Sequence, residues 1–136
     1  MINANVAIPP DDRIFEDDRW PASLRADLDE VRKGRDRARR MLGSNPYPQA
    51  TNPLAKTTML ERQAAALGHE FLLPPINVTF EAGVNAAGVE QPACTGCGDC
   101  VSGCNVGAKN TLLMNYLPDA QRWGASIFTG IDVRWI

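Results

Sequence analysis

Several features that assign a chain to a common class are missing from this sequence of 136 residues. No apolar run approaches the roughly 20 residues that a membrane-spanning helix needs. The N-terminus also lacks the basic and apolar stretches of a secretory signal. We therefore expect no integral membrane segment and a cytoplasmic location. The formal net charge is only −2, which gives no general attraction to nucleic acid or to an anionic membrane.

Local runs of charge do not change these expectations. Seven basic residues lie between Arg25 and Arg40, but four acidic residues interrupt them. No aromatic residues are interleaved there for base stacking, so we expect no nucleic-acid partner. The acidic stretch around Phe15 lacks the spacing of a cation-binding loop. We interpret it as solvated surface.

Catalytic motifs are scarce as well. The sequence contains no G-x-G-x-x-G, no phosphate-loop pattern and no Gly-x-Ser-x-Gly. Its single histidine, His69, follows a predicted helix end, and no carboxylate or nucleophile in the local sequence is evidently arranged with it. We therefore assign no catalytic residue.

The hydrophobic patterns predict an α+β fold in a single domain spanning residues 1–136. Trp20-Pro21 introduces a helix from about residue 22. Leu24, Leu28 and Val31 form an apolar stripe on it that we expect in the core. Gly34 is expected to divide this segment into two helices, and Gly43 to end the second.

Further elements are expected along the rest of the chain. A second long helix is predicted from an Asn52 cap to Gly68, and a half-buried strand at 76–80. A loop at 81–92 leads to the cysteines, and a helix at about 110–124 precedes strands at 126–129 and 131–136. The apolar residues assigned to the core on the two helices are Leu54, Met59, Leu60, Ala64, Leu67, Leu112, Leu113, Tyr116 and Leu117.

All four cysteines lie within eleven positions, as Cys94, Cys97, Cys100 and Cys104. The spacing C-x2-C-x2-C-x3-C is the run with which bacterial ferredoxins hold iron–sulfur clusters, and intervening glycines permit the tight curl that it needs. In two-cluster ferredoxins, however, the fourth cysteine ligates the other cluster. This chain has no second run. A cluster, a zinc ion, a redox disulfide and unliganded thiols therefore remain alternatives for the ferredoxin-like loop 94–104.

The residues after the cysteines carry a family resemblance. The string Gly107-Ala-Lys109-Asn-Thr111-Leu-Leu-Met-Asn-Tyr116-Leu117-Pro118-Asp-Ala120 resembles the cholesterol-oxidase-like branch of the FAD-dependent glucose–methanol–choline (GMC) oxidoreductases. Ile2-Asn3-Ala4-Asn5-Val6 is similar to the end of that family's glycine-rich stretch along the flavin. Residues 11–90 match the family only in general layout.

This resemblance implies FAD as cofactor, with Asn3, Ala4, Asn5 and Val133 at the flavin, and hydride transfer from a CH–OH group of an alcohol or sterol substrate. The family's Rossmann G-x-G-x-x-G and its catalytic histidine have no counterpart in these 136 residues. We therefore expect an incomplete interior fragment of a Rossmann-like enzyme. Its partner would be the missing remainder, without which it is inactive. The rival reading is a 4Fe–4S electron-transfer module on the four cysteines.

Overall fold

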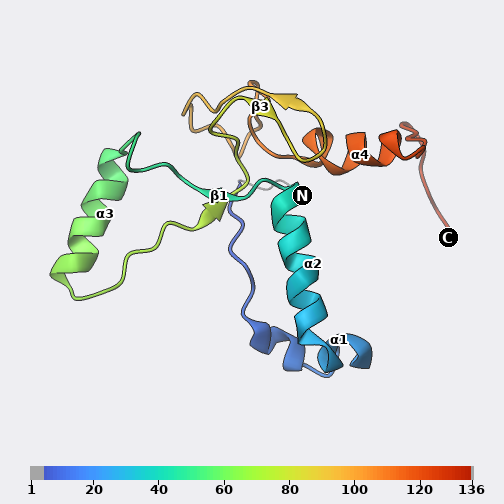
Figure 1. The fold of residues 1–136 in the computed structure, drawn as a ribbon, viewed down its shortest axis with the longest axis horizontal. Helices are drawn as coiled ribbons and strands as arrows, with labels where there is room; N and C mark the ends of the chain where they lie inside the picture. Colours follow the sequence, from blue (N-terminus) through green and yellow to red (C-terminus); the bar gives the residue numbers. More distant parts are fainter. Residues whose placement is uncertain (1–4, 136) are drawn as a thin grey trace.

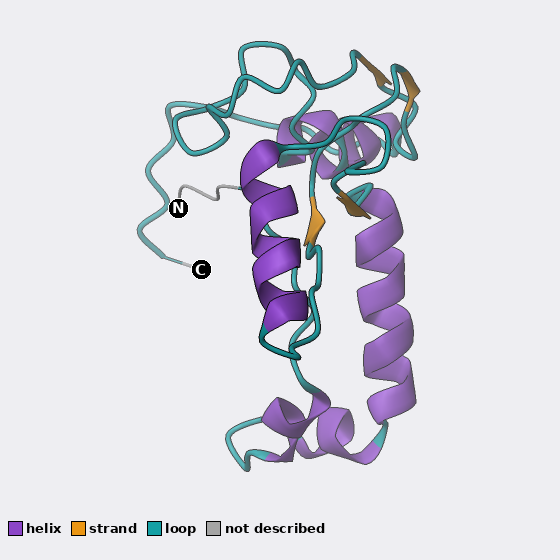
Figure 2. Cartoon of the chain, turned by 90° about the vertical axis from the view of Figure 1, so that its left-hand side faces the viewer, coloured by secondary structure: helices purple, strands orange, loops and turns teal. Residues whose placement is uncertain are grey.

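A computed structural model describes residues 5–135 and shows a mixed α+β fold in which loops predominate (Figures 1 and 2). Helices project from a central region of loops and short strands instead of packing into layers. The elements in chain order are η1 (Asp12–Glu16), α1 (Ala22–Ala26), α2 (Leu28–Met41), β1 (Asn45–Pro46), α3 (Ala55–Ala66), β2 (Pro75–Ile76), β3 (Gly83–Val84), β4 (Glu90–Gln91), η2 (Leu112–Met114) and α4 (Tyr116–Arg122).

The strands form two small antiparallel sheets of two strands each. In the first, β1 pairs with β2, with Asn45 opposite Ile76. An isolated bridge joins Val6 to Ile76 and another joins Val78 to Lys109. In the second, β3 and β4 form a hairpin within the segment predicted to be only a loop. The α+β class is therefore confirmed, with shorter strands than expected.

The first two helices differ from the prediction in where the chain breaks. The break falls at Asp27, whose non-helical backbone, with φ of −133° and ψ of 74°, ends α1. Its side chain accepts a hydrogen bond from the Glu30 N–H and so caps α2. Gly34 lies inside α2, so the predicted division there is wrong. Gly43, with φ of 55°, follows the end of α2 as expected, since glycine adopts this left-handed conformation without strain.

Helix α3 ends before Gly68, which has φ of 69°, as the sequence predicts. Its start differs, because Leu54 occupies the N-cap position and the predicted Asn52 cap is wrong. The Gln49 side chain accepts a hydrogen bond from the Leu54 N–H at 3.1 Å instead. A glutamine five positions away thus satisfies one of the backbone donors that a helix start leaves unpaired.

The C-terminal third also departs from expectation. The predicted helix at about 110–124 is split into η2 and α4 at Asn115, whose side-chain oxygen accepts a hydrogen bond from the Tyr116 N–H at 2.7 Å. Residues 125–135 contain neither helix nor strand, so the two predicted strands there are wrong over the described residues. A strand needs a partner to satisfy its backbone groups, and within the described chain these residues have none.

The buried centre of the described chain is mainly polar. We call it the polar hub. Its buried apolar residues are Val78, Ala87 and Ala108. Its buried polar residues are Ser44, Asn77, Gln91, Lys109, Asn110 and Asn115.

The residues predicted to form an apolar core lie elsewhere. Leu24 is 39% exposed, Met59 61% and Leu113 69%. The five helices α1, α2, α3, η2 and α4 contain no buried residue. The core expectation for these helices is therefore wrong, because amphipathic spacing predicts a face but not what covers it.

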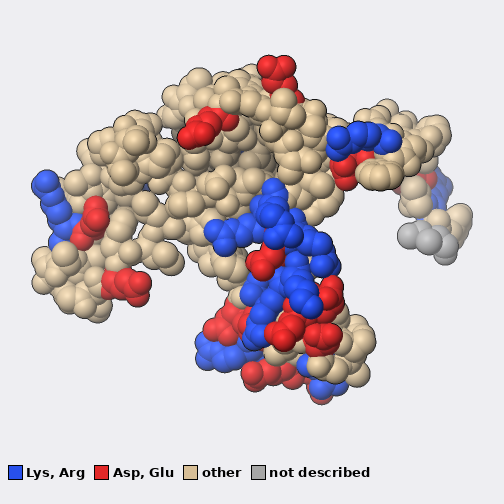
Figure 3. All heavy atoms as spheres, in the orientation of Figure 1, with Lys and Arg blue, Asp and Glu red and all other residues tan. Residues whose placement is uncertain are grey.

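Charged side chains gather on η1, α1 and α2, which we call the charged arm (Figure 3). Arg32 and Arg35 both contact Asp12, with nitrogen–oxygen distances of 2.7 and 2.9 Å. These pairs join η1 to α2. No residue from 11 to 18 is buried, so the acidic stretch around Phe15 is surface, as expected. In the part of the chain that is described, no helix is both long enough and apolar enough to cross a membrane.

Candidate cysteine site and adjoining pocket

The cysteine loop is closed at its base by backbone hydrogen bonds to one short segment. The Cys94 N–H donates to the Thr79 carbonyl at 2.9 Å, and the Thr79 N–H donates to the Ala108 carbonyl at 2.8 Å. Two residues further along, the Asn110 N–H donates to the Asn77 carbonyl at 3.0 Å. The segment 77–79 of the polar hub therefore ties both ends of the loop together.

Glycines allow the loop to curl between these ends. Gly96 and Gly98 have φ of 72° and 82°, a conformation that other residues adopt only with strain. An added Cβ at either position would meet no atom within 4 Å. Glycine is therefore needed at these two positions for the backbone conformation and not for close packing. This agrees with the tight curl inferred from the sequence.

All four cysteines line one small cavity of about 20 Å³. All four are free thiols, and Cys97 is exposed while the other three are partly buried. That they bind one metal centre stays a prediction. The cavity is close to one water molecule in size, so a larger group would require the glycine-rich side of the loop to move outward.

A zinc ion and an iron–sulfur cluster need different arrangements of the thiols. Among residues 5–135, no group of three or more His, Cys, Asp or Glu side chains is placed to hold a metal ion. Zinc needs its thiolate sulfurs about 2.3 Å from a single ion. A four-iron cluster with four cysteines instead surrounds itself with more widely spaced thiolates, one on each iron. Neither donor arrangement is formed among the described residues, so zinc and a cluster stay predictions from the sequence.

The thiols of the loop also differ in their electrostatics. Burial alone raises the pKa of the Cys104 thiol, but backbone N–H groups from residues 106–109 stabilise its thiolate and bring the net pKa below the usual value. Burial raises the pKa of Cys100, and the neighbouring Cys94 adds to this while Lys109 opposes it. Cys104 is therefore the better prepared of the two to act as a thiolate.

The residues expected at a flavin are only partly described. Asn3 and Ala4 lie outside the described residues. Asn5 lies beside the cysteine loop, where its side-chain amide donates to the Cys100 sulfur at 3.4 Å. Val133 is 69% exposed, in the segment after α4 without regular structure. These residues do not by themselves form an FAD site, since the glycine-rich helix start that binds the pyrophosphate is absent from the sequence.

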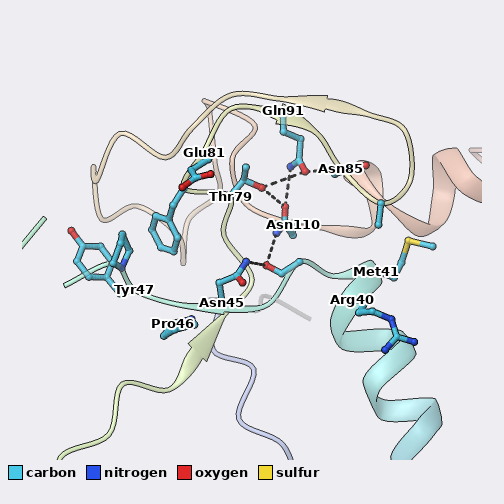
Figure 4. A pocket seen from close by; sticks show the side chains of 14 residues that line it. Arg40, Met41, Asn45, Pro46, Tyr47, Thr79, Glu81, Asn85, Gln91 and Asn110 are labelled. Atoms are coloured by element: carbon cyan, nitrogen blue, oxygen red, sulfur yellow. Dashed lines mark hydrogen bonds between the residues drawn. The ribbon is translucent and has the colours of Figure 1, made fainter. Parts of the chain in front are cut away.

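A pocket of about 590 Å³ lies between the end of α2 and the polar hub (Figure 4). Tyr47 and Phe80 form one wall, with their rings edge to face and their centroids 5.4 Å apart. Gln91 and Asn110 line its polar side, between Tyr47 and Met41 in this view. This volume is in the range of small-molecule sites. His69, by contrast, is exposed, and it is not among the residues that line this pocket.

The polar side of the pocket was not found by sequence reasoning. Gln91 is 1% exposed, and its amide nitrogen donates to the Gly107 carbonyl and the Asn110 side chain, each at 3.0 Å. Its amide oxygen accepts from Asn85 at 2.7 Å. The loop at 81–92 contains one Asn and one Gln among mostly small residues, and that composition is equally typical of a solvated loop.

Comparison with known proteins connects almost the whole chain to one group of enzymes. It is 30% identical over 140 residues to a cholesterol oxidase of Acinetobacter baumannii, a match that covers 92% of this chain and 24% of that protein. It is 29% identical over 146 residues to the cholesterol oxidases of two Mycobacterium tuberculosis strains, covering 96% of this chain and 25% of each. The chain therefore spans about a quarter of the length of these relatives. No family model matches it, and no solved structure does.

Proposed function

We propose that this chain is an interior segment of an FAD-dependent oxidoreductase of the GMC family that oxidises a CH–OH group of an alcohol or sterol. The observation that carries this proposal is the similarity to cholesterol oxidases over 92% to 96% of the chain. The motif from Gly107 to Ala120 and the Asn3–Asn5 stretch, which resemble that family's pattern, support it as well.

The structure supports two parts of this proposal. The pocket beside Tyr47 and Phe80 has the volume of a small-molecule site and combines aromatic with polar lining, which suits a largely apolar alcohol. The exposed apolar side chains of α3, α4 and the following segment, such as Met59, Trp123 and Phe128, would be covered by the rest of a Rossmann-like enzyme. In that assembly Asn5 and Val133 would lie at the FAD.

The test is to express the continuous reading frame that contains this chain together with its flanking DNA. We expect a yellow protein whose flavin absorbance near 450 nm bleaches anaerobically on addition of cholesterol or a simpler secondary alcohol. The 136-residue chain with added FAD serves as the control and should bind it weakly. A reading frame without an in-frame glycine-rich strand–turn–helix, or a full-length product that binds no flavin, would overturn the proposal.

A second candidate function is a 4Fe–4S electron-transfer module. The specific observation in its favour is that all four cysteines line one cavity. The chain purified anaerobically would then be brown and contain iron and acid-labile sulfide. A colourless protein that stays metal-free after anaerobic incubation with ferrous iron, ferric iron and sulfide would exclude this candidate. The two functions are compatible if the full enzyme carries a cluster beside its flavin.

A further inference from the structure

Another cavity, of about 540 Å³, lies between the cysteine loop and the polar hub. Residues 101–103 of the loop and residues 109–112, which follow it, form most of its lining. The other described residues that line it are Asn5, Leu42 and Asn77. Among the described residues, it shares only Asn110 with the larger pocket at the end of α2. Its volume is in the range of small-molecule sites, so it is a separate candidate site.

The lining of this cavity carries one positive charge. Lys109 is the cation, and none of the described residues that line the cavity is Asp or Glu. Lys109 is 9% exposed, and its Nζ donates to the Cys100 carbonyl at 2.7 Å. That bond orients the side chain, and an ammonium group can donate up to three hydrogen bonds. Because little solvent screens a buried charge, the cavity is electrostatically suited to an anion.

Uncharged donors line the same cavity. Asn77 is 7% exposed, and its side-chain oxygen accepts a hydrogen bond from the Ser44 hydroxyl. Within the part of the chain that is described, the Asn77 amide nitrogen has no acceptor, and the Thr111 hydroxyl makes no hydrogen bond. Hydrogen bonds from such groups to a carboxylate are strengthened by its charge. The cavity therefore combines a cation with donors that a bound anion would satisfy.

The remaining lining is apolar and comprises Leu42, Val101 and Leu112. Val101 is 62% exposed and Leu112 56%, so a ligand that covers them removes apolar surface from water. A single positive charge beside an apolar surface matches a monoanion that has a hydrocarbon part. An alkyl carboxylate has both features, whereas a phosphate monoester carries nearly two negative charges at neutral pH.

We propose that this cavity binds a short alkyl carboxylate, with its charged group at Lys109 and Asn77 and its hydrocarbon chain against Val101 and Leu112. The site is separate from the pocket assigned to the alcohol, and binding requires neither flavin nor metal. The bound ligand joins residues 101–103 of the cysteine loop to the polar hub.

The first experiment tests whether the charge of the ligand decides binding. Hexanoate and its uncharged analogue hexanamide are titrated separately into the isotope-labelled 136-residue chain, and the amide chemical shifts are followed by NMR. We expect hexanoate to shift the amides of residues 101–103 and 109–112 and to bind at least about tenfold more tightly than hexanamide. Equal affinities, or shifts confined to other residues, would overturn the proposal. Tighter binding of inorganic phosphate than of hexanoate would overturn the assignment of a carboxylate.

The second experiment changes the charge beside the cavity at an exposed position. Leu112 and Leu113 are adjacent in η2 and are 56% and 69% exposed, but Leu113 does not line the cavity. We expect Leu112→Glu to weaken hexanoate binding about three- to tenfold and Leu112→Lys to strengthen it by a similar factor, because the two charges act on the carboxylate with opposite sign. The matched controls Leu113→Glu and Leu113→Lys should change the affinity less than about twofold. Equal changes at the two positions would overturn the site.

The third experiment removes the cation itself. Lys109→Met keeps a long side chain without its charge, and we expect hexanoate binding to weaken more than about tenfold. The control is Lys56→Met, at an exposed position of α3, which should bind hexanoate as the original chain does. Unchanged amide shifts in α2 and α3 identify a folded Lys109→Met, and retained binding in that folded variant would overturn the proposal. If Lys109→Met does not fold, the Leu112 variants decide.

Discussion

The polar hub and the charged arm are held together in opposite ways. In the hub, contacts join residues far apart in the sequence, such as the Ser44 hydroxyl donating to the Asn77 side chain and the Asn110 side chain donating to the Gly43 carbonyl. In the arm, partly exposed ion pairs join neighbouring helices. Buried uncharged groups lose much stability when one partner is removed, whereas exposed ion pairs contribute little. The hub therefore determines the fold, and the arm tolerates change.

The most damaging substitution should be Gln91→Ala in the hub. Gln91 is 1% exposed and bonds Asn85, Gly107 and Asn110. Each buried partner left unsatisfied costs about 1–3 kcal/mol, so we expect a loss of about 3 kcal/mol or more in the free energy of unfolding. Urea denaturation followed by tryptophan fluorescence measures it. The matched control is Gln121→Ala, at an exposed position of α4, and it should change stability by less than about 0.5 kcal/mol. Equal losses in the two variants would contradict the distinction between hub and surface.

A smaller loss is expected from Gly43→Ala, where the charged arm enters the hub. Gly43 has φ of 55°, and an added Cβ would lie 2.9 Å from the Asn110 side-chain nitrogen. The left-handed backbone alone costs an alanine about 1–2 kcal/mol. Gly83→Ala is the control, since no atom lies within 4 Å of its added Cβ. Thermal unfolding of both variants should show a lowered midpoint for Gly43→Ala only.

The smallest effect is expected from Asp12→Asn in the charged arm. The substitution removes the carboxylate that Arg32 and Arg35 share, but the pairs are partly exposed to solvent and are therefore screened by salt. We expect a slight loss of stability at low ionic strength that disappears in about 1 M salt. Urea unfolding at the two salt concentrations provides the measurement. A loss as large as that of Gln91→Ala would reverse the comparison between arm and hub.

The same carboxylate predicts a pH dependence confined to acid. The hydrogen bond from Arg32, and then that from Arg35, lower the pKa of Asp12 below its usual value. Because the folded-state pKa is the lower one, this stabilisation is fully present above the unfolded-state pKa near 4 and is lost as the pH falls through the folded-state value. Stability curves of the original chain and Asp12→Asn should therefore converge at strongly acidic pH.

The parts of the fold that were predictable depend on local signals. Gly43 and Gly68 mark helix ends through their own backbone conformation, and Trp20-Pro21 precedes a helix because proline suits its start. The cysteine loop was predictable for the same reason, since its spacing and its glycines lie in one continuous stretch. Its contact with Asn5 was not predictable, because nothing in the sequence connects positions 95 residues apart.

The parts that could not be predicted depend on partners. Leu24, Met59 and Leu113 have the spacing of buried faces, yet periodicity alone does not show which segment covers a face. Residues 126–135 have strand-like composition but lack a pairing strand among the described residues. Gln91 and Asn110 are typical surface residues by type, and only their mutual hydrogen bonds make their burial favourable.

Closure of the cysteine loop by Thr79 affects how strongly any ligand can bind there. The entropy of bringing the ends of a flexible loop together must be lost once, and it grows slowly with loop length. In this chain the hydrogen bonds of Thr79 to Cys94 and Ala108 already hold the ends together without a ligand. The loop-closure entropy is therefore lost when the chain folds and not when a ligand binds. A free peptide carrying residues 94–109 has the same thiols but must close on its ligand. It should therefore bind the ligand more weakly than the folded chain does.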